Sequence, residues 1–382
     1  MIGVNNVSET GQALKYYQLD NYYTNSQQAL DQTEWYGQGA QILGIEGEQV
    51  ESQTFADLLN GKVDDQQLGR IRIDEAGNKY IEHRAAMDIT FSAPKSVSIL
   101  AEVYQNQDVL EAHQNAVKET LSTIEENFVQ TRLSEDGQKQ KVDSDNLIVA
   151  LFNHNTSRAL DPQTHTHAVV MNATFNDKDA WSSISNEAIY ANQSVIGSIY
   201  NANLANNLKE LGLDLEVKDN KGNFEIAGFS PDVLEEFSQR RKQIIDSLSD
   251  RGIDIGDAPA SLREQAALKT RDRKKGFDEQ ELRESWKSRA SELGVSEKFI
   301  DDIRIKIKEN KLIADPQLEN ETQPKVTQDN HEEPQASNKH QDQYEPAQDQ
   351  MTAPQASDKH QDQSEPAQDQ MTAPQASDKH QD

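Results

Sequence analysis

The feature of this chain that most constrains its fold is a histidine pattern shared by two β-forming runs. The run LIVALFNH ends in His154, and the run THTHAVVMNATF carries His165 and His167 two residues apart. Because side chains at i and i+2 of a strand point to one face, His165 and His167 aim at a common point. Antiparallel pairing through the loop NTSRALDPQT would bring His154 beside them, with Asp161 placed to orient an imidazole. The pattern therefore predicts a sheet in which these two strands are neighbours.

These three histidines are candidate metal ligands. Three neutral imidazoles can hold a divalent ion and leave positions open for a substrate oxygen. An exposed polar pair on an edge strand would explain the HxH pattern alone, but the third histidine on a neighbouring strand favours a metal site. Three imidazoles accept several ions: Mg²⁺ or Mn²⁺ are expected first, with Zn²⁺ and Ni²⁺ as alternatives. The chain has no cysteine, so thiolate ligands are excluded.

A second candidate group is a cluster of tyrosines near the N-terminus. The segment LKYYQLDNYYT contains Tyr16, Tyr17, Tyr22 and Tyr23. Aromatic core packing is one explanation for them. The other is chemical, because a tyrosine can attack a phosphodiester and keep the phosphate as a covalent ester. Its proton must be removed and the phosphate polarised, for which a carboxylate and a metal are suited. Together with the histidines, the tyrosines suggest cleavage of DNA by transesterification.

An acid inside an otherwise apolar strand is the third candidate. Asp88 lies in HRAAMDITFSAPKSVSIL, and a buried acid needs a reason for its position. Two explanations remain open: pairing with a cation such as Arg84 or Lys95, or service at an active site. Strand alternation puts Asp88, Thr90 and Ser92 on one face and Ile89 and Phe91 on the other.

Composition divides the chain near residue 312. Before this point apolar periodic segments are frequent, and we expect residues 1–311 to form the folded body. Beyond it, Gln, Asp, Pro and Ala dominate in a 20-residue repeat, of which PQASDKHQDQSEPAQDQMTA is one copy. These repeats have almost no apolar side chains to bury, so we expect 312–382 to be a disordered acidic tail.

The body has the sequence pattern of an α+β fold. The predicted strands are 70–75, 78–83, 86–91, 146–153 and 165–173. The predicted helices are 94–103, 107–127, 186–211, 231–250, 259–271, 278–293 and 296–310. In SPDVLEEF, Ser230 suits an N-cap and Pro231 the first helical position.

The charge balance permits nucleic-acid binding without demanding it. A formal charge of −28 argues against a uniformly basic surface, but the local field along a groove decides what binds there. Two interpretations of the basic clusters stay open: a solvated helix face, or a contact with phosphate. The candidate DNA contacts are Arg84, Lys95, Arg158, Arg240, Arg241, Lys242, Arg271, Arg273, Lys274 and Lys275. Two roles also stay open for Trp35, Tyr36 and Trp181: stacking on DNA bases, or packing in the core.

No membrane segment is expected. No apolar run approaches the roughly 20 residues that span a bilayer. The N-terminus has no basic start followed by an apolar core, which is the pattern of a signal peptide. We therefore expect a soluble cytoplasmic protein without membrane insertion.

Several strings together resemble the relaxase domain of the TrwC/TraI-type conjugative relaxases, a branch of the HUH endonucleases. They are YYQLDNYY, WYGQGAQILGIEG, DITFSAPKSVS and HNTSRALDPQTHTHAVVMN, and the resemblance covers roughly residues 10 to 295. It implies a five-stranded antiparallel sheet flanked by helices, with a mostly helical C-terminal part, here 230–311, that closes over DNA. It also implies site- and strand-specific nicking and rejoining at a plasmid origin of transfer through a covalent 5′-phosphotyrosine.

The resemblance also assigns roles to residues. It makes Tyr16 the initial nucleophile and Tyr22 a second one, with Tyr17 and Tyr23 as the alternatives beside them. Asp88 becomes the proton acceptor or the group that orients a histidine. The metal triad becomes His154, His165 and His167.

The expected partners follow from the same resemblance. They are the single strand and hairpin at a transfer origin, relaxosome accessory proteins and a coupling protein. No GxxxxGK[ST] phosphate loop occurs, so ATP use is not expected. Three other functions stay open: a rolling-circle replication initiator, a non-catalytic origin-binding remnant that regulates its own transcription, and a metallohydrolase in which water attacks.

Overall fold

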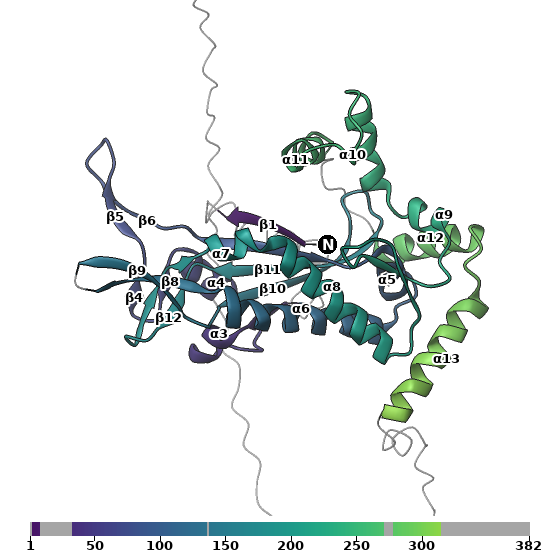
Figure 1. Cartoon of the computed structure of the whole chain (residues 1–382), viewed down its shortest axis with the longest axis horizontal. Coiled ribbons are helices and arrows are strands. Elements are labelled where there is room, and N and C mark those ends of the chain that lie inside the picture. Colours follow the sequence, from purple (N-terminus) through teal and green to yellow (C-terminus); the bar gives the residue numbers. More distant parts are fainter. Residues whose placement is uncertain (1, 8–32, 136, 271–277, 315–382) are drawn as a thin grey trace, which may run out of the picture. The chain divides into compact units, whose positions relative to one another are not determined.

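The centre of the protein is a five-stranded antiparallel sheet. The computed structural model describes residues 2–7, 33–135, 137–270 and 278–314. From one edge to the other the strands are β1 (Ile2–Val7), β7 (Ala86–Ser92), β11 (Pro162–Met171), β10 (Val149–Thr156) and β2 (Thr33–Tyr36) (Figure 1). Every neighbouring pair is antiparallel. The predicted α+β fold with a five-stranded antiparallel sheet is thus confirmed.

One face of the sheet is covered by two long helices, α6 (Gln107–Phe128) and α8 (Gln193–Glu210) (Figure 1). Ile89 and Phe91 of β7 join Leu121 of α6 in the larger apolar core, and all three are fully buried. Burial of a side chain of this size contributes about 1.5–3 kcal/mol. The predicted alternation of β7 is confirmed, because its apolar residues face these helices.

The opposite face is apolar toward one end and polar toward the other. Trp35, Phe55 and Phe152 pack there with the helices α3 (Gln38–Ile42) and α4 (Ser52–Leu59). The registers of β7, β10 and β11 put five polar side chains on this same face: Asp88, Thr90, His154, His165 and His167. The sheet therefore supports the candidate site on the face that α6 and α8 leave free.

The predicted helices all occur, several of them in two pieces. The helix expected over 94–103 begins as α5 (Lys95–Ser98) and continues as a π-helix, η2 (Ile99–Val103). The helix expected over 186–211 is divided at Asn192 into α7 (Glu187–Ala191) and α8. The remaining C-terminal helices are α11 (Ala260–Lys269), α12 (Glu279–Glu292) and α13 (Glu297–Ala314).

The helix expected over 231–250 is divided into α9 (Pro231–Glu236) and α10 (Gln239–Ser249). Ser230 accepts a hydrogen bond from the third helical N–H of α9, which confirms it as an N-cap. At the break, the Gln239 N–H donates to Asp161 Oδ2 at 2.8 Å. A contact distant in sequence thus takes the donor that a continuous helix would use.

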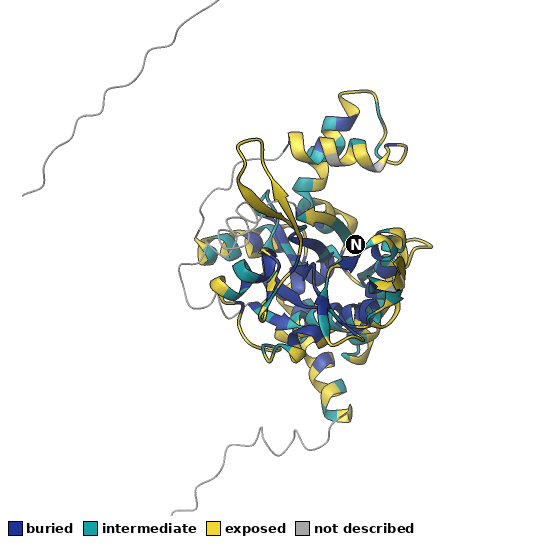
Figure 2. Cartoon of the chain, turned by 90° about the vertical axis from the view of Figure 1, so that its left-hand side faces the viewer, coloured by how far each residue is buried: buried dark blue, intermediate teal, exposed yellow. Residues whose placement is uncertain are grey.

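Short antiparallel sheets surround the main sheet. Among the described residues, four of them are two-stranded: β3 (Lys62–Val63) with β4 (Gln66–Gln67), β5 (Arg70–Ile73) with β6 (Lys79–Glu82), β12 (Thr174–Asn176) with β13 (Ala180–Ser182), and β15 (Leu215–Val217) with β16 (Phe224–Ile226). A further sheet has three strands, in which β8 (Gln130–Glu135) lies between β9 (Gln138–Asp143) and β14 (Ile184–Ser185). The β5–β6 and β8–β9 hairpins project from the same end of the molecule (Figure 1). Every residue of β5 and β6 is exposed (Figure 2).

All five predicted strands are observed, with their ends shifted by a few residues. The edge strands β1 and β2 were not predicted. At the C-terminal end, α13 continues to Ala314, past the boundary expected at 311. Residues 315–382, which include the repeats, lie outside the described residues. Among the helices that are described, none is long and apolar enough to cross a membrane.

Candidate functional site

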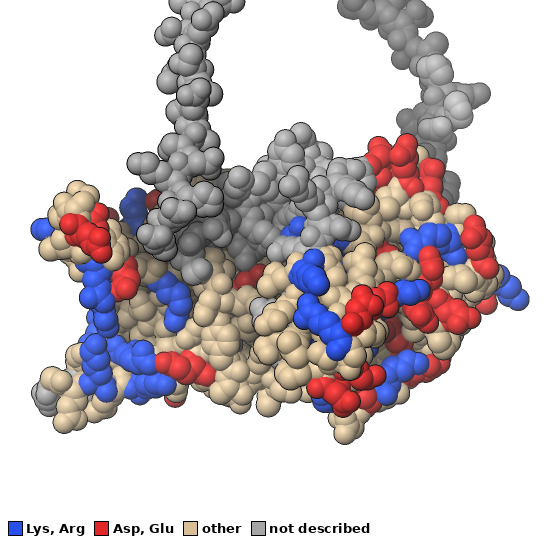
Figure 3. All heavy atoms as spheres, turned by 90° about the horizontal axis from the view of Figure 1, so that it is seen from above, with Lys and Arg blue, Asp and Glu red and all other residues tan. Residues whose placement is uncertain are grey.

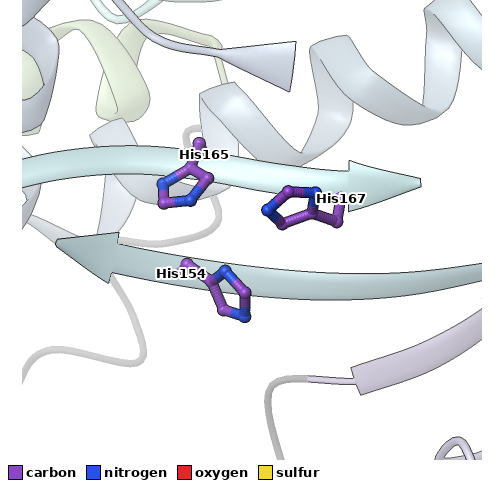
Figure 4. A group of neighbouring side chains, drawn as sticks. All are labelled: His154, His165 and His167. Atoms are coloured by element: carbon purple, nitrogen blue, oxygen red, sulfur yellow. The ribbon is translucent and has the colours of Figure 1, made fainter. Parts of the chain in front are cut away.

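The three predicted metal ligands come together on β10 and β11. His154 is the direct antiparallel partner of His165, and His167 follows two residues later on the same face. One nitrogen from each ring lies within 4.8 Å of a nitrogen of each other ring. Figure 4 shows the three rings gathered on the two neighbouring strands. This arrangement confirms that the two histidine runs are adjacent antiparallel strands.

Hydrogen bonds orient two of the rings. The Nδ1 of His167 lies 2.8 Å from Asp88 Oδ2, and the Nδ1 of His165 lies 2.8 Å from the Gln163 carbonyl oxygen. Because a carboxylate and a carbonyl only accept, each Nδ1 carries the proton. In the neutral form of each ring, the Nε2 atom is then the one with the lone pair that a metal ligand needs.

The third ring has a buried nitrogen that lacks a protein partner. Among the described residues, none hydrogen-bonds the buried Nε2 of His154. A buried polar atom without a partner is costly, and one facing two other imidazoles fits a bound cation. The donor set and this nitrogen agree with a divalent metal centre.

Burial keeps His154 and His165 neutral. Burial, and after it repulsion from His167, lowers the pKa of His165 to about 4. Burial and the two neighbouring rings hold the pKa of His154 well below its usual range. Neutral imidazoles are required for metal binding, so the site is prepared for a cation at neutral pH.

Asp88 supports the site from the neighbouring strand β7. Asp88 is 6% exposed, and its side chain lies on the same face as the histidines. Thr90 Oγ1 donates to Asp88 Oδ1 at 3.3 Å. Both cations considered as partners for Asp88 donate elsewhere: Arg84 to Asn172 and Ile184, and Lys95 to Pro162 and Gln163. The contact of Asp88 with His167 therefore favours the site over simple charge pairing.

Asp161 has a different position from the one expected. Its place in the β10–β11 loop predicted that it would orient an imidazole. Its carboxylate instead accepts the Gln239 N–H at the start of α10. Asp88 is the carboxylate that orients a histidine, and it lies 79 residues away from that histidine in sequence.

The candidate nucleophiles Tyr16, Tyr17, Tyr22 and Tyr23 lie outside the described residues. Their segment connects β1 with β2, which form the two edges of the main sheet. Their assignment as nucleophiles stays a prediction.

The candidate DNA-binding cations have different surroundings. Arg84 and Lys95 donate into the protein, and burial lowers the pKa of Lys95 to about 8. Arg240 joins α10 to α11 through the carbonyl oxygens of Thr270 and Ala267. The remaining described candidates are exposed or half-buried: Arg158, Arg241 and Lys242. Four candidates lie outside the described residues: Arg271, Arg273, Lys274 and Lys275.

The three aromatic candidates for base stacking make interior contacts. Trp35 and Trp181 are 1% and 5% exposed and belong to the smaller apolar core. The Tyr36 hydroxyl donates to the Lys118 carbonyl oxygen at 3.1 Å. Core packing therefore accounts for the two tryptophans.

A surface feature that the sequence did not single out is the β5–β6 ribbon. Its strands present Arg70, Arg72 and Lys79 together with exposed isoleucines, of which Ile71 is 73% exposed. Figure 3 shows Lys and Arg side chains gathered at the end of the molecule where the two hairpins project. Strands were predicted at 70–75 and 78–83, but only the structure shows that, among the described residues, nothing covers the ribbon that they form.

Comparison with known proteins identifies close relatives. The family model described as TrwC relaxase matches residues 10–293. The multifunctional conjugation protein TraI of Escherichia coli K12 is 34% identical over 304 residues, which are 77% of this chain and 16% of TraI. The chain thus spans about one sixth of the curated relatives that it matches.

Solved structures agree with this result. The metal-free conjugative relaxase TrwC in complex with oriT DNA is 34% identical, with a TM-score of 0.67 over 78% of this chain and 100% of that one. Its metal-bound complex gives a TM-score of 0.68 over 78% of this chain and 99% of that one, also at 34% identity. A third TrwC structure holds a 27-mer DNA comprising the recognition hairpin and the cleavage site, with a TM-score of 0.67, 33% identity, and 78% and 99% of the two chains covered. By sequence and by fold, this chain belongs to the TrwC relaxase family.

Proposed function

We propose that this chain nicks and rejoins one DNA strand at a plasmid origin of transfer through a covalent 5′-phosphotyrosine. The observation that carries the proposal is the convergence of His154, His165 and His167, with His167 held by Asp88. Membership of a family whose solved TrwC members hold oriT DNA supports the choice of substrate.

The three histidines would hold a divalent ion through ring nitrogens. When bound, such an ion polarises a phosphate and stabilises the charge that develops on its oxygens. Asp88 keeps the proton of His167 on Nδ1 and fixes the orientation of the ring. Of the two roles considered for Asp88, its direct contact with His167 favours the orienting one.

The nucleophile in this proposal is Tyr16. Its phenolic oxygen attacks phosphorus, an O–P bond to the tyrosine forms, and the bond from phosphorus to the 3′ oxygen breaks. The phenolic proton passes to a base, and the departing 3′ oxygen takes up a proton. The 5′ phosphate stays on the tyrosine, which preserves the bond energy for rejoining by a 3′ hydroxyl. Tyr22 would act in a second transfer.

The ribbon β5–β6 is the proposed contact for duplex DNA in the hairpin. A two-stranded ribbon fits the major groove, and apolar side chains can contact thymine methyl groups there. Arg70 and Arg72 alternate with Ile71 and Ile73, so phosphate contacts and base contacts would come from opposite faces. The exposed Arg241 and Lys242 of α10, within the helical part 230–311, would hold the single strand.

The wider setting follows from the same proposal. Relaxosome accessory proteins and a coupling protein are the expected partners, and the reaction would take place in the cytoplasm. The metal expected in the cell is Mg²⁺ or Mn²⁺.

The test is denaturing electrophoresis after incubation with Mn²⁺ and a labelled single-stranded oligonucleotide from the transfer origin of the encoding plasmid. We expect a shifted, protease-sensitive band that is lost in Tyr16→Phe and kept in Tyr344→Phe, a matched control in the repeat tail. Cleavage without an adduct would instead indicate attack by water. Tight hairpin binding without cleavage would indicate a non-catalytic remnant.

A further inference from the structure

The loop between β10 and β11 closes the hairpin that carries all three histidines. Within it, the Ser157 N–H donates to the Asp161 carbonyl oxygen at 2.9 Å, and the Asp161 N–H donates to Ser157 Oγ at 3.1 Å. Leu160 has a φ of 60°, a left-handed conformation that costs a non-glycine residue about 1–2 kcal/mol. The register shifts between His154 and Thr156, just before the loop. The loop conformation therefore helps to set where His154 lies opposite His165.

This strained loop is held by the C-terminal helices. Trp286 of α12, 2% exposed, donates its indole N–H to the Leu160 carbonyl oxygen at 2.8 Å. The Gln239 N–H at the start of α10 donates to Asp161 Oδ2 at 2.8 Å. Arg289 of α12 lies 3.6 Å from the other carboxylate oxygen of Asp161. Two helices from a distant part of the sequence thus meet at residues 160 and 161.

Asp161 is a buried carboxylate placed between elements that are far apart in the sequence. It is 1% exposed. Burial raises its pKa, while Lys95, the Gln239 N–H and Arg289 favour its charged form. Lys95 in turn donates to the Pro162 carbonyl oxygen and so reaches the first residue of β11. A buried charge with partners on α5, α10 and α12 resists any independent movement of these elements.

We propose that Asp161 is a positioning residue that makes the metal site depend on the docking of α10 and α12. This proposal rests on the proposed function in one respect, namely that the three histidines hold a divalent ion. The helix that carries Arg241 and Lys242 is one of the two that Asp161 ties to the histidine strands. The part of the chain proposed to hold the single strand is thus mechanically joined to the metal centre.

The test measures Mn²⁺ binding by the full chain without DNA, from the electron paramagnetic resonance signal of free Mn²⁺. Removal of a group that supports metal ligands typically weakens affinity by about 10–100-fold. We expect Asp161→Ala to weaken Mn²⁺ binding by at least about ten-fold, and Trp286→Phe to weaken it less, since one neutral hydrogen bond is lost. Asp246→Asn is the matched control: it removes an exposed carboxylate from α10 and should leave the affinity unchanged.

Hydrogen exchange on the same variants separates this inference from a folding defect and from the proposed function. Asp161→Ala should raise exchange at the start of α10 and at the start of β11 together, with α6 protected as in the wild type. Asp161→Asn keeps an acceptor for the Gln239 N–H, so it should raise exchange at these two segments less than Asp161→Ala does. Unchanged exchange at both segments, or wild-type Mn²⁺ affinity in Asp161→Ala, would overturn the inference. A wild-type chain that binds no Mn²⁺ would count against the proposed function, and the exchange pattern would still decide the coupling of helices and strand.

Discussion

His113 allows a stability prediction whose size can be worked from the structure. The residue lies on α6, is 1% exposed, and has Nδ1 2.8 Å from the Tyr200 hydroxyl and Nε2 3.0 Å from Thr166 Oγ1. Because Thr166 Oγ1 donates to Asn153 Oδ1 at 2.6 Å, the ring donates to Thr166 and accepts from Tyr200. His113→Phe would leave the buried Tyr200 hydroxyl without its acceptor, at about 1–3 kcal/mol. It would also remove one hydrogen bond from Thr166 Oγ1, which keeps its bond to Asn153, at about 0.5–1.5 kcal/mol. We expect a loss of about 2–4 kcal/mol in the free energy of unfolding.

The same residue predicts a dependence on pH. Burial lowers the pKa of His113 to about 3, below its ordinary 6.5. Between these values the unfolded chain binds more protons than the folded chain, so stability falls as the pH drops from 6.5 toward 3. The loss is at most about 1.4 kcal/mol for each pH unit. Between about pH 6.5 and 4.5, wild type should therefore lose about 2–3 kcal/mol more than His113→Phe does.

Urea unfolding at about pH 7.5, 6.5 and 4.5, followed by circular dichroism in the presence of a chelator, measures both effects. His331→Phe, in the segment after α13, is the matched control and should behave as wild type. His113→Gln, whose amide can both donate and accept, should recover part of the stability at the highest pH. The reasoning would be refuted if His113→Phe had the urea midpoint of the wild type at the highest pH. It would also be refuted if wild type and His113→Phe lost equal stability between the highest and the lowest pH.

Three further predictions concern the metal and DNA. Asp88→Ala should weaken Mn²⁺ binding by about 10–100-fold, measured from free Mn²⁺, and an unchanged affinity would show that the Asp88–His167 bond does not support the site. Mn²⁺ at about 100 times its dissociation constant should add about 2.7 kcal/mol to the free energy of unfolding, and removal with a chelator should reverse this in urea titrations. Arg70→Ala with Arg72→Ala should reduce the salt dependence of hairpin binding by about two units of log–log slope, and a wild-type slope would exclude the ribbon from phosphate contact.

The part of the site that is local in sequence could be predicted. Two histidines separated by one residue on a strand share a face by geometry alone, and the third lies on the strand that a short loop brings back. Asp88 was recognised as unusual because it interrupts an apolar strand. Its partner His167 could not be named, because 79 residues separate them and both explanations for the acid fitted the sequence.

The parts that depend on tertiary contacts could not be predicted. Lys95 and Arg84 are charged in the sequence, but only the fold shows that their donors are satisfied inside the protein. At the break in the helix predicted over 231–250, the Gln239 N–H bonds to Asp161, a partner distant in sequence. The strand β1, with the sequence IGVNNV, has polar residues where alternation would need apolar ones, and its pairing with β7 forms it.

The two faces of β11 together fix the register that the metal site needs. On one face, His167 bonds Asp88 of β7, and on the other, Thr166 bonds His113 of α6. A slip of one residue would turn Thr166 toward the site and drive both β11 histidines into the core beneath α6, since strand side chains alternate. Both hydrogen bonds would then be lost together, and each loss would leave buried polar atoms without that partner, which is unfavourable. The polar residue between the two histidines is therefore as much a determinant of the metal centre as the ligands are.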